Sequence, residues 1–264
     1  MDDWRNRTGK PLSSAAWLEA HHQAKLPERM RFAKKLAQYA PRRIIDLGCA
    51  TGLWLDLLHP LVPRDCEFIG YDSDAESLAV AKRRASAWSR PAHFEQLDIA
   101  ADAGLIPPAD LTLIFNVIPF IQDPADLLVK LSERRDTGVV AIRQYDGDSL
   151  RFGPMDTHTR ALIEASLRSS VGLSEQFRHY DMDHVFELVH NTPYRNRTIE
   201  FELFERVAPF PPEFIEYLGQ TLAWTQNFLS EDAAAALEVW RRSFLRAPSA
   251  PSYLFEVDLT AVLS

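Results

Sequence analysis

Cysteine is scarce in this sequence: its 264 residues include only two, Cys49 and Cys66. Two cysteines cannot build a disulfide framework, and neither lies in a CxxC pair or in a Cys/His cluster with metal-ligand spacing. The sequence therefore predicts no metal site and a protein of the reducing cytoplasm.

Long apolar runs are also missing. No run approaches the roughly 20 apolar residues that a helix needs to cross a bilayer. The amino terminus, MDDWR, lacks the apolar segment of an export signal. We therefore expect neither a membrane span nor an export signal.

Positively charged residues are fewer than acidic residues. Lysine and arginine number 29 against 37 acidic residues, which gives a formal net charge of -8. Binding to a nucleic-acid backbone depends on clustered lysine and arginine, so a nucleic-acid partner is not expected, although a local basic patch stays open. The composition, 46% hydrophobic and 25% charged, is that of a globular protein with a sizeable core.

Short apolar segments alternate with helix-forming segments between residues 41 and 153. Their continuous or alternating apolar pattern predicts five strands, at residues 43–47, 67–71, 93–97, 111–116 and 138–143. The helices predicted between them cover residues 53–58, 75–88 and 124–134. Such alternation with short connections predicts right-handed crossovers and a doubly wound parallel sheet with helices on both faces.

The flanking segments follow other patterns. Helices are predicted in residues 13–40, divided at Pro27, and in residues 157–170, 181–190 and most of 211–246; strands are predicted at 197–207 and 253–262, where polar and apolar residues alternate. We expect seven strands in all and three parts: an N-terminal helical cap (1–40), a nucleotide-binding core (41–153), and helices that form a lid with two final strands completing the same domain (154–264).

A glycine loop follows the first predicted strand. It reads Asp46-Leu47-Gly48-Cys49-Ala50-Thr51-Gly52 and lies at the sheet edge where open α/β folds bind ligands. Any turn between a strand and a helix can carry glycines, so the loop alone indicates only a nucleotide-binding turn. It has neither GxGxxG nor GxxxxGK[ST] spacing, so it does not predict a phosphate cradle.

Acidic residues follow the next two strands. The second strand ends at Asp72, roughly twenty residues downstream, where a carboxylate can accept hydrogen bonds from both ribose hydroxyls. Asp74 is the natural helix cap, and a purely capping role is the alternative for Asp72. After the third strand, Asp98 and Ile99 offer an acceptor and an apolar side chain that suit an adenine, with an exposed loop acid as the alternative.

These residues resemble the class I S-adenosylmethionine-dependent methyltransferases, whose first motif is an acidic residue followed by a Gly-x-x-x-Gly loop. The resemblance covers residues 40 to 150 and implies a Rossmann-like fold with S-adenosylmethionine as cofactor. By this resemblance the cofactor-binding residues are Asp46, Gly48, Cys49, Ala50 and Gly52 around the methionine, Asp72 and Ser73 at the ribose, Asp98 and Ile99 at the adenine, and Phe115 and Asn116 beside the sulfonium.

The sequence says less about the methyl acceptor than about the cofactor. Methyl transfer to an acceptor that is already nucleophilic needs mainly positioning, whereas a hydroxyl acceptor usually needs a base. In many members of the family a histidine follows the fourth strand, but residues 116–120 read NVIPF here. A histidine of the later segment stays open as a base, namely His158, His179, His184 or His190, of which we single out His184.

Charged residues gather just past the fifth predicted strand, in residues 141–148 (AIRQYDGD). The guanidinium of Arg143 could fork onto a substrate carboxylate or phosphate, and Asp146 could receive an ammonium or a proton. The alternative is an internal ion pair between Arg143 and Asp146 that only shapes the loop. Arg143, Asp146 and His184 are therefore the candidate catalytic residues.

Aromatic and polar residues outside the core segment could contact the acceptor. Aromatic rings attract a sulfonium or ammonium, although tryptophan and tyrosine at helical spacing more often pack in a core. The acceptor-side candidates are Trp17, Arg143, Gln144, Tyr145, Tyr180, Trp224 and Asn227, with Trp4 as a further aromatic.

We therefore predict an enzyme that methylates nitrogen or oxygen of a small polar metabolite or natural-product intermediate bearing an acid or an amine. The low positive charge disfavours RNA or DNA methylation, while protein methylation and a homodimer stay open. Two alternatives keep the cofactor: a rearrangement or cyclisation without methyl transfer, and an inactive regulatory protein, because a fold does not dictate a reaction.

Overall fold

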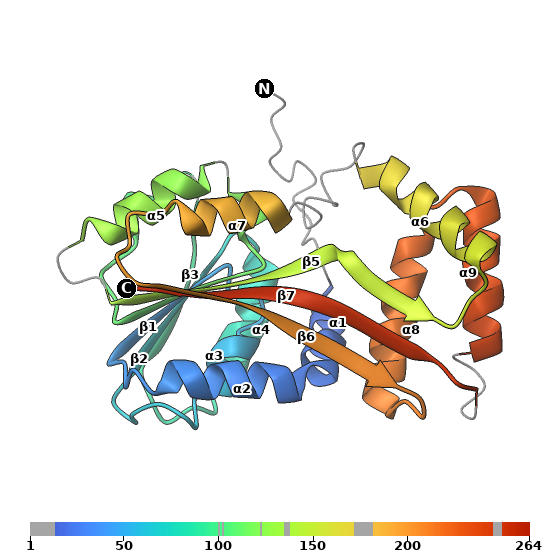
Figure 1. Ribbon diagram of the computed structural model, residues 1–264. Coiled ribbons are helices and arrows are strands. Elements are labelled where there is room, and N and C mark those ends of the chain that lie inside the picture. Colours follow the sequence, from blue (N-terminus) through green and yellow to red (C-terminus); the bar gives the residue numbers. More distant parts are fainter. Residues whose placement is uncertain are drawn as a thin grey trace.

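Seven strands form one sheet in the computed structural model, which describes residues 14–264 except 100, 102, 122, 135–137, 172–181 and 245–249 (Figure 1). Their order across the sheet is β3-β2-β1-β4-β5-β7-β6. The strands are β1 (Arg43–Leu47), β2 (Glu67–Asp72), β3 (Ala92–Gln96), β4 (Leu111–Phe115), β5 (Val139–Gly153), β6 (Arg197–Val207) and β7 (Tyr253–Leu263).

Strands β1 to β5 run parallel, and β7 pairs antiparallel with both β5 and β6. The chain reverses its direction across the sheet between β1 and β4, which is where open α/β sheets form a ligand crevice. The predicted doubly wound, mostly parallel seven-stranded sheet is confirmed.

Strand β5 is much longer than the predicted strand at residues 138–143. Its second half pairs with β7, with Arg151 opposite Phe255 and Gly153 opposite Tyr253. Charged and glycine residues in this stretch resemble a loop in sequence, but the distant β7 supplies their backbone hydrogen bonds. The prediction of a short strand was therefore wrong.

One face of the parallel strands is covered by α2 (Leu26–Ala37), α3 (Leu53–Leu58) and α4 (Ala75–Ala85). Their buried side chains, including Phe32, Leu55 and Leu78, form a core with alternate residues of the strands such as Ile44 and Phe68. Neighbouring residues in a strand point to opposite faces, so the residues next to these, Ile45 and Ile69, belong to the other core.

The opposite face is covered by α5 (Pro124–Ser132) and α7 (Met182–His190), seen above the sheet in Figure 1. Two short 3-10 helices, η1 (Ala103–Leu105) and η2 (Ile118–Phe120), complete this layer. Leu128 and Val185 are among the residues that pack there against Ile142. Helix α5 ends two residues before the predicted limit of 134.

A third core lies around the distal halves of β5, β6 and β7. Helices α1 (Ala15–Ala24), α6 (Thr157–Val171), α8 (Pro212–Gln226) and α9 (Glu231–Phe244) surround it (Figure 1). Phe204, Phe214 and Trp240 are buried in this core. The predicted helical segment 211–246 is divided because α8 ends before Asn227 and the Ser230 hydroxyl accepts from the Ala233 N–H at the start of α9.

Local signals position the N-terminal helices. The Ser14 hydroxyl accepts a hydrogen bond from the Trp17 N–H and caps α1, and Pro27 occupies the first turn of α2. Lys25 links the two helices.

Among the described residues, no helix is both long and apolar enough to cross a membrane.

Candidate active site

The loop between β1 and α3 is a tight turn that requires glycine. Gly48 and Gly52 both have a φ of 76°, and a Cβ on Gly48 would lie only 2.2 Å from Val117 Cγ2. The N–H groups of Gly48 and Cys49 donate to the Tyr71 carbonyl at 2.8 and 2.9 Å. These contacts hold the loop against the end of β2 and leave its backbone beside the sheet edge.

Asp72 ties this loop to the start of α4. Its carboxylate accepts the Ala50 N–H at 2.8 Å and the Asp74 N–H at 2.9 Å. Asp74 is the residue that caps α4, since its carboxylate accepts from the N–H groups of Glu76 and Ser77. The two acids therefore differ in role: Asp74 is the helix cap, and Asp72 joins two backbone segments.

A second carboxylate lies beside Asp72. Asp46, at the end of β1, is buried, and burial together with the charge of Asp72 raises the pKa of Asp46 to about 8. Burial also raises the pKa of Asp72, against hydrogen bonds from the Asp74 and Ala50 N–H groups that favour the ionised form. Two neighbouring carboxyl groups that are shielded from water, as in Asp46 and Asp72, favour the binding of a cation.

The candidate adenine residues lie past the end of β3. Asp98 is exposed and accepts a hydrogen bond from the Ala101 N–H at 3.3 Å, while Ile99 is buried in the core under α5 and α7. Ser73 is exposed, and its carbonyl accepts from the Gln96 amide at 2.8 Å. This arrangement leaves the carboxylate of Asp98 at the surface beside an apolar floor.

The end of β4 is pinned to β5. Asn116 adopts a left-handed conformation with a φ of 57°, its N–H donates to the Arg143 carbonyl, and its side-chain Oδ1 accepts from the Tyr145 N–H, both at 2.8 Å. Asparagine tolerates this backbone conformation better than most residues. Phe115 is buried against Trp54, with ring centroids 4.6 Å apart.

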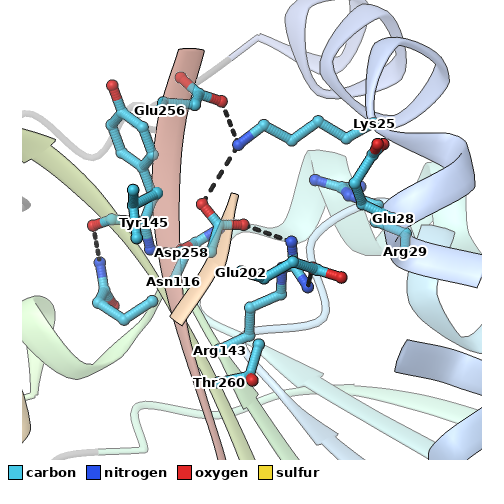
Figure 2. Close-up of polar contacts among 12 residues, drawn as sticks. Lys25, Glu28, Arg29, Asn116, Arg143, Tyr145, Glu202, Glu256, Asp258 and Thr260 are labelled. Atoms are coloured by element: carbon cyan, nitrogen blue, oxygen red, sulfur yellow. Dashed lines mark hydrogen bonds and ion pairs between the residues drawn. The ribbon is translucent and has the colours of Figure 1, made fainter. Parts of the chain in front are cut away.

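Arg143 is buried between two carboxylates from other strands (Figure 2). Its Nη1 lies 2.6 Å from Glu202 Oε2, and its Nη2 lies 2.5 Å from Asp258 Oδ2. Residues 143 and 146 are three apart in an extended strand and so point to opposite faces. The sequence left open an ion pair between Arg143 and Asp146. That alternative is wrong, because Arg143 forms its ion pairs with Glu202 and Asp258.

Lys25 extends this network toward the N-terminal helices. Its Nζ forms ion pairs with Glu256 and, at 3.3 Å, with Asp258, and it lies 5.1 Å from the centre of the Tyr145 ring (Figure 2). Sequence reasoning missed this cluster. Its signal was in β7, where Glu256 and Asp258 occur at positions of the alternating pattern that face inward with Leu254.

Arg29 is a further buried cation that the sequence did not single out. Its Nη1 lies 2.7 Å from His22 Nδ1 and its Nη2 lies 3.2 Å from His21 Nδ1. All three side chains are about nine-tenths buried or more, at 6% exposure each. The guanidinium lies over the Trp54 ring, 5.2 Å from its centre.

The acceptor-side candidates on β5 flank an irregularity in the strand. Tyr145 is half-buried, Gln144 is buried and donates to the Tyr145 carbonyl, and Asp146 is half-buried on the face opposite Arg143. Pairing with β7 shifts between Asp146 and Arg151, and bulges of this kind often re-aim side chains beside binding sites.

The remaining candidates lie on helices. Trp17 is half-buried, its ring lies 4.7 Å from the tilted His21 ring, and it donates to Thr221. It therefore lies beside His21, a hydrogen-bond partner of Arg29. Trp224 and Asn227 are exposed near the end of α8, where Trp224 contacts Phe228. His184 is exposed on α7. Tyr180, His179 and Trp4 lie outside the described residues.

The strand ends thus bring together residues that are far apart in the sequence. Asp46 and Asp72 interact directly through their charges, and Asn116 joins β4 to Arg143 and Tyr145. His184, Trp224 and Asn227 are exposed on helices α7 and α8 and at the end of α8. Among the described residues, no group of three or more His, Cys, Asp or Glu is arranged to hold a metal ion.

Known proteins resemble this chain in sequence. Residues 45–138 match the model of a methyltransferase domain. A trans-aconitate 2-methyltransferase of Methylobacterium nodulans is 33% identical over 137 residues, covering 50% of this chain and 51% of that protein. The enzyme of the same name from Acidovorax ebreus is 32% identical over 135 residues, covering 49% and 50%. The chain spans about half the length of the curated relatives it matches.

The fold recurs in solved structures. Phosphoethanolamine N-methyltransferase 2 of Haemonchus contortus superposes with a TM-score of 0.57 at 15% identity, over 100% of this chain and 60% of that one. At this identity the likeness concerns the fold alone. The domain match identifies residues 45–138 as a methyltransferase domain, and the solved structure shares the fold of this chain.

Proposed function

We propose that this protein transfers a methyl group from S-adenosylmethionine to a carboxylate of a small polar molecule. The observation that carries the proposal is the double hydrogen bond of Asp72 to the Ala50 and Asp74 N–H groups, beside the buried Asp46. It holds the glycine loop and the start of α4 in one rigid unit at the edge of the sheet.

The residues present fit each part of the cofactor. A buried carboxylate whose pKa is raised to about 8, as in Asp46, gains most from a cation such as the methionine ammonium. The tight turn at Gly48 lets backbone approach a ligand, and we assign to Asp72 the ribose hydroxyls, from which a carboxylate can accept hydrogen bonds. Asp98 and Ile99 then offer an acceptor and an apolar floor for adenine. When bound, the cofactor supplies an electrophilic methyl carbon on a sulfonium.

The carboxylate acceptor is favoured by the two relatives, both named trans-aconitate 2-methyltransferase. Chemistry agrees, because a carboxylate is ionised at neutral pH and needs no base, so positioning supplies most of the rate. No histidine follows β4, and His184 is exposed. We therefore propose a reaction without a histidine base.

The acceptor would lie at the ends of β4 and β5. We propose that Phe115 and Asn116 line the methyl-transfer position, and that Gln144, Tyr145, Asp146 and Trp17 border the acceptor. Both terminal nitrogens of Arg143 are engaged by carboxylates of this chain, so it acts as a positioning residue that keeps Tyr145 and Asn116 in register. The C-terminal segment, residues 154–264, would complete this side of the site within the same domain.

The test is incubation with methyl-labelled S-adenosylmethionine and separate pools of trans-aconitate, other polycarboxylates, primary amines and phenols. A carboxylate acceptor predicts label in an ester that alkali releases as methanol. Label in an amine or phenol would overturn the acceptor class. Cofactor turnover without label transfer would favour a rearrangement, and binding without turnover would favour a regulatory protein.

A matched control separates binding from catalysis. The Asp72→Ala variant should lose labelling in parallel with its loss of cofactor affinity, whereas Asp74→Ala, which removes only the helix cap, should keep most of the labelling activity. If calorimetry detects no binding of S-adenosylmethionine or S-adenosylhomocysteine to the unaltered chain, the proposed function is wrong.

A further inference from the structure

Arg29 is a buried cation whose hydrogen-bonding capacity is incompletely used. It lies in the first half of α2 and is 6% exposed. Its two terminal nitrogens contact ring nitrogens of His22 and His21, but no described residue accepts a hydrogen bond from its Nε. A guanidinium presents its donors in a rigid fork that matches a carboxylate, so an unused buried donor marks a place for an acceptor.

The two histidines do not neutralise this charge. Burial lowers the pKa of His22 to about 3, and burial together with the charges of Arg29 and Lys25 lowers the pKa of His21 well below its ordinary value. Since the guanidinium can only donate, each Nδ1 must accept, which places the ring proton on Nε2. His21 and His22 are therefore neutral acceptors that orient Arg29.

The neighbouring carboxylates of the chain already have cations. Glu28 pairs with Arg206 at 3.0 Å, and Glu256 and Asp258 pair with Lys25, with Asp258 also bound by Arg143. Among the residues that the structure describes, no carboxylate lies within ion-pair distance of Arg29. Asp258 and Glu256 act on Arg29 only through their charges, so its guanidinium has no direct carboxylate partner among these residues.

The position of Arg29 connects it to the site already described. Its guanidinium stacks on Trp54, which lies two residues after Gly52 of the glycine loop. Trp54 in turn contacts Phe115 at the end of β4, the residue before Asn116. The cation thus borders both the glycine loop and the strand end where the proposed function places methyl transfer.

We infer that Arg29 is a receptor for a carboxylate of a bound small molecule, with His21 and His22 holding its guanidinium in place and Trp54 supporting it. The identity of that molecule rests on the proposed function. The carboxylate belongs either to the methionine part of S-adenosylmethionine or to the acceptor acid. Either carboxylate would accept the same hydrogen bonds from the guanidinium of Arg29.

Binding measurements distinguish the two sources. S-adenosylhomocysteine carries the methionine-type carboxylate, whereas 5′-methylthioadenosine lacks the whole amino acid. If the carboxylate is that of the cofactor, Arg29→Gln should weaken S-adenosylhomocysteine about tenfold or more and leave 5′-methylthioadenosine unchanged. If it is that of the acceptor, Arg29→Gln should leave both unchanged and weaken trans-aconitate by a similar factor in the presence of saturating S-adenosylhomocysteine.

Two further variants guard against a merely structural effect. Arg29→Lys keeps the charge but loses the fork, so its affinity should fall between those of the unaltered chain and Arg29→Gln. Lys34→Gln removes an exposed cation from the same helix and should change neither affinity. Near-ultraviolet circular dichroism and thermal unfolding establish that each variant is folded.

Equal binding of all three probes by Arg29→Gln and the unaltered chain would overturn the inference, as would an equal loss of S-adenosylhomocysteine and 5′-methylthioadenosine binding. Failure of the proposed function looks different, because the unaltered chain would then bind no S-adenosylhomocysteine. In that case, stabilisation of the unaltered chain but not Arg29→Gln by millimolar trans-aconitate would still support a carboxylate receptor, and its absence would overturn it.

Discussion

Arg143 on β5 and Asp258 on β7 form a buried ion pair, with Arg143 Nη2 2.5 Å from Asp258 Oδ2. The pair joins the last parallel strand of the sheet to the antiparallel strand that follows it across the sheet. Asp258 is shared with Lys25, and its pKa is lowered to about 2 because these two cations outweigh the effect of burial. The N-terminal helices are thereby connected to the strands that border the candidate acceptor site.

Replacing Arg143 by methionine should destabilise the fold by about 1–3 kcal/mol, because Asp258 and Glu202 lose the guanidinium that they share while Lys25 and Arg31 remain as their other cations. Urea unfolding measures this. Lys35→Met is the control, since Lys35 forms a largely exposed pair with Glu200 and should cost less than about 1 kcal/mol. Similar losses for the two variants would show that the buried pair contributes little.

Asp72→Ala should weaken S-adenosylhomocysteine by about 10- to 100-fold, because charged hydrogen bonds contribute about 1.5–3 kcal/mol and this carboxylate also orders the loop at Ala50. Isothermal titration calorimetry gives the affinity. Asp74→Ala removes a helix cap and should lower stability by about 0.5–2 kcal/mol with a much smaller change in affinity. The opposite ranking of the two variants would reverse the assigned roles.

Asp46 should make the ligand-free protein less stable as the pH rises. Its ordinary pKa of 3.8 is raised to about 8 in the folded chain, so between these values the folded state holds a proton that the unfolded state has released. Stability then falls with pH by up to roughly 1.4 kcal/mol per pH unit across the window and levels off above it.

The measurement for Asp46 is unfolding of the unaltered chain and Asp46→Asn from pH 5 to pH 9. Asparagine cannot ionise, so the variant should be the more stable form at pH 9, with an advantage that shrinks toward pH 5. A difference between the two proteins that stays constant with pH would mean that Asp46 is ionised throughout.

Gly48→Ala should both destabilise the protein and weaken cofactor binding. The left-handed backbone costs about 1–2 kcal/mol for a residue with a Cβ, and the overlap with Val117 costs about 1–3 kcal/mol more. Val117→Ala removes the overlapping methyl groups, so the double variant should recover the second part only. Full recovery would show that the backbone conformation is not strained, and no recovery would place the clash elsewhere.

Strands β1 and β4 were predictable because each is a local apolar run that ends at a turn. Strand β6 was predicted with its observed limits, since polar and apolar residues alternate along it. The length of β5 was not predictable, because its last residues, 151–153, pair with β7, about a hundred residues later in the chain. Local propensity carries no information about a partner so distant in sequence.

The candidate site divides in the same way. Gly48, Asp72 and Asn116 are candidates that the sequence alone suggested, because each lies at the end of a strand and parallel strands end at one edge. The buried pairing of Arg143 with Asp258 and the position of Arg29 beside Trp54 were not, because they join segments of no fixed spacing. No periodic pattern in the sequence identifies the partner of a charged residue, because the two side chains meet only when the chain folds.

By itself the sequence determined the order of strands and helices, the glycine turn and the acids at the strand ends, since these depend on backbone geometry and on residues close in the chain. Only the tertiary structure decided which charges are buried together. Desolvation and pairing act across the sheet, so Arg143 became part of an internal network while Arg29 kept an unused donor.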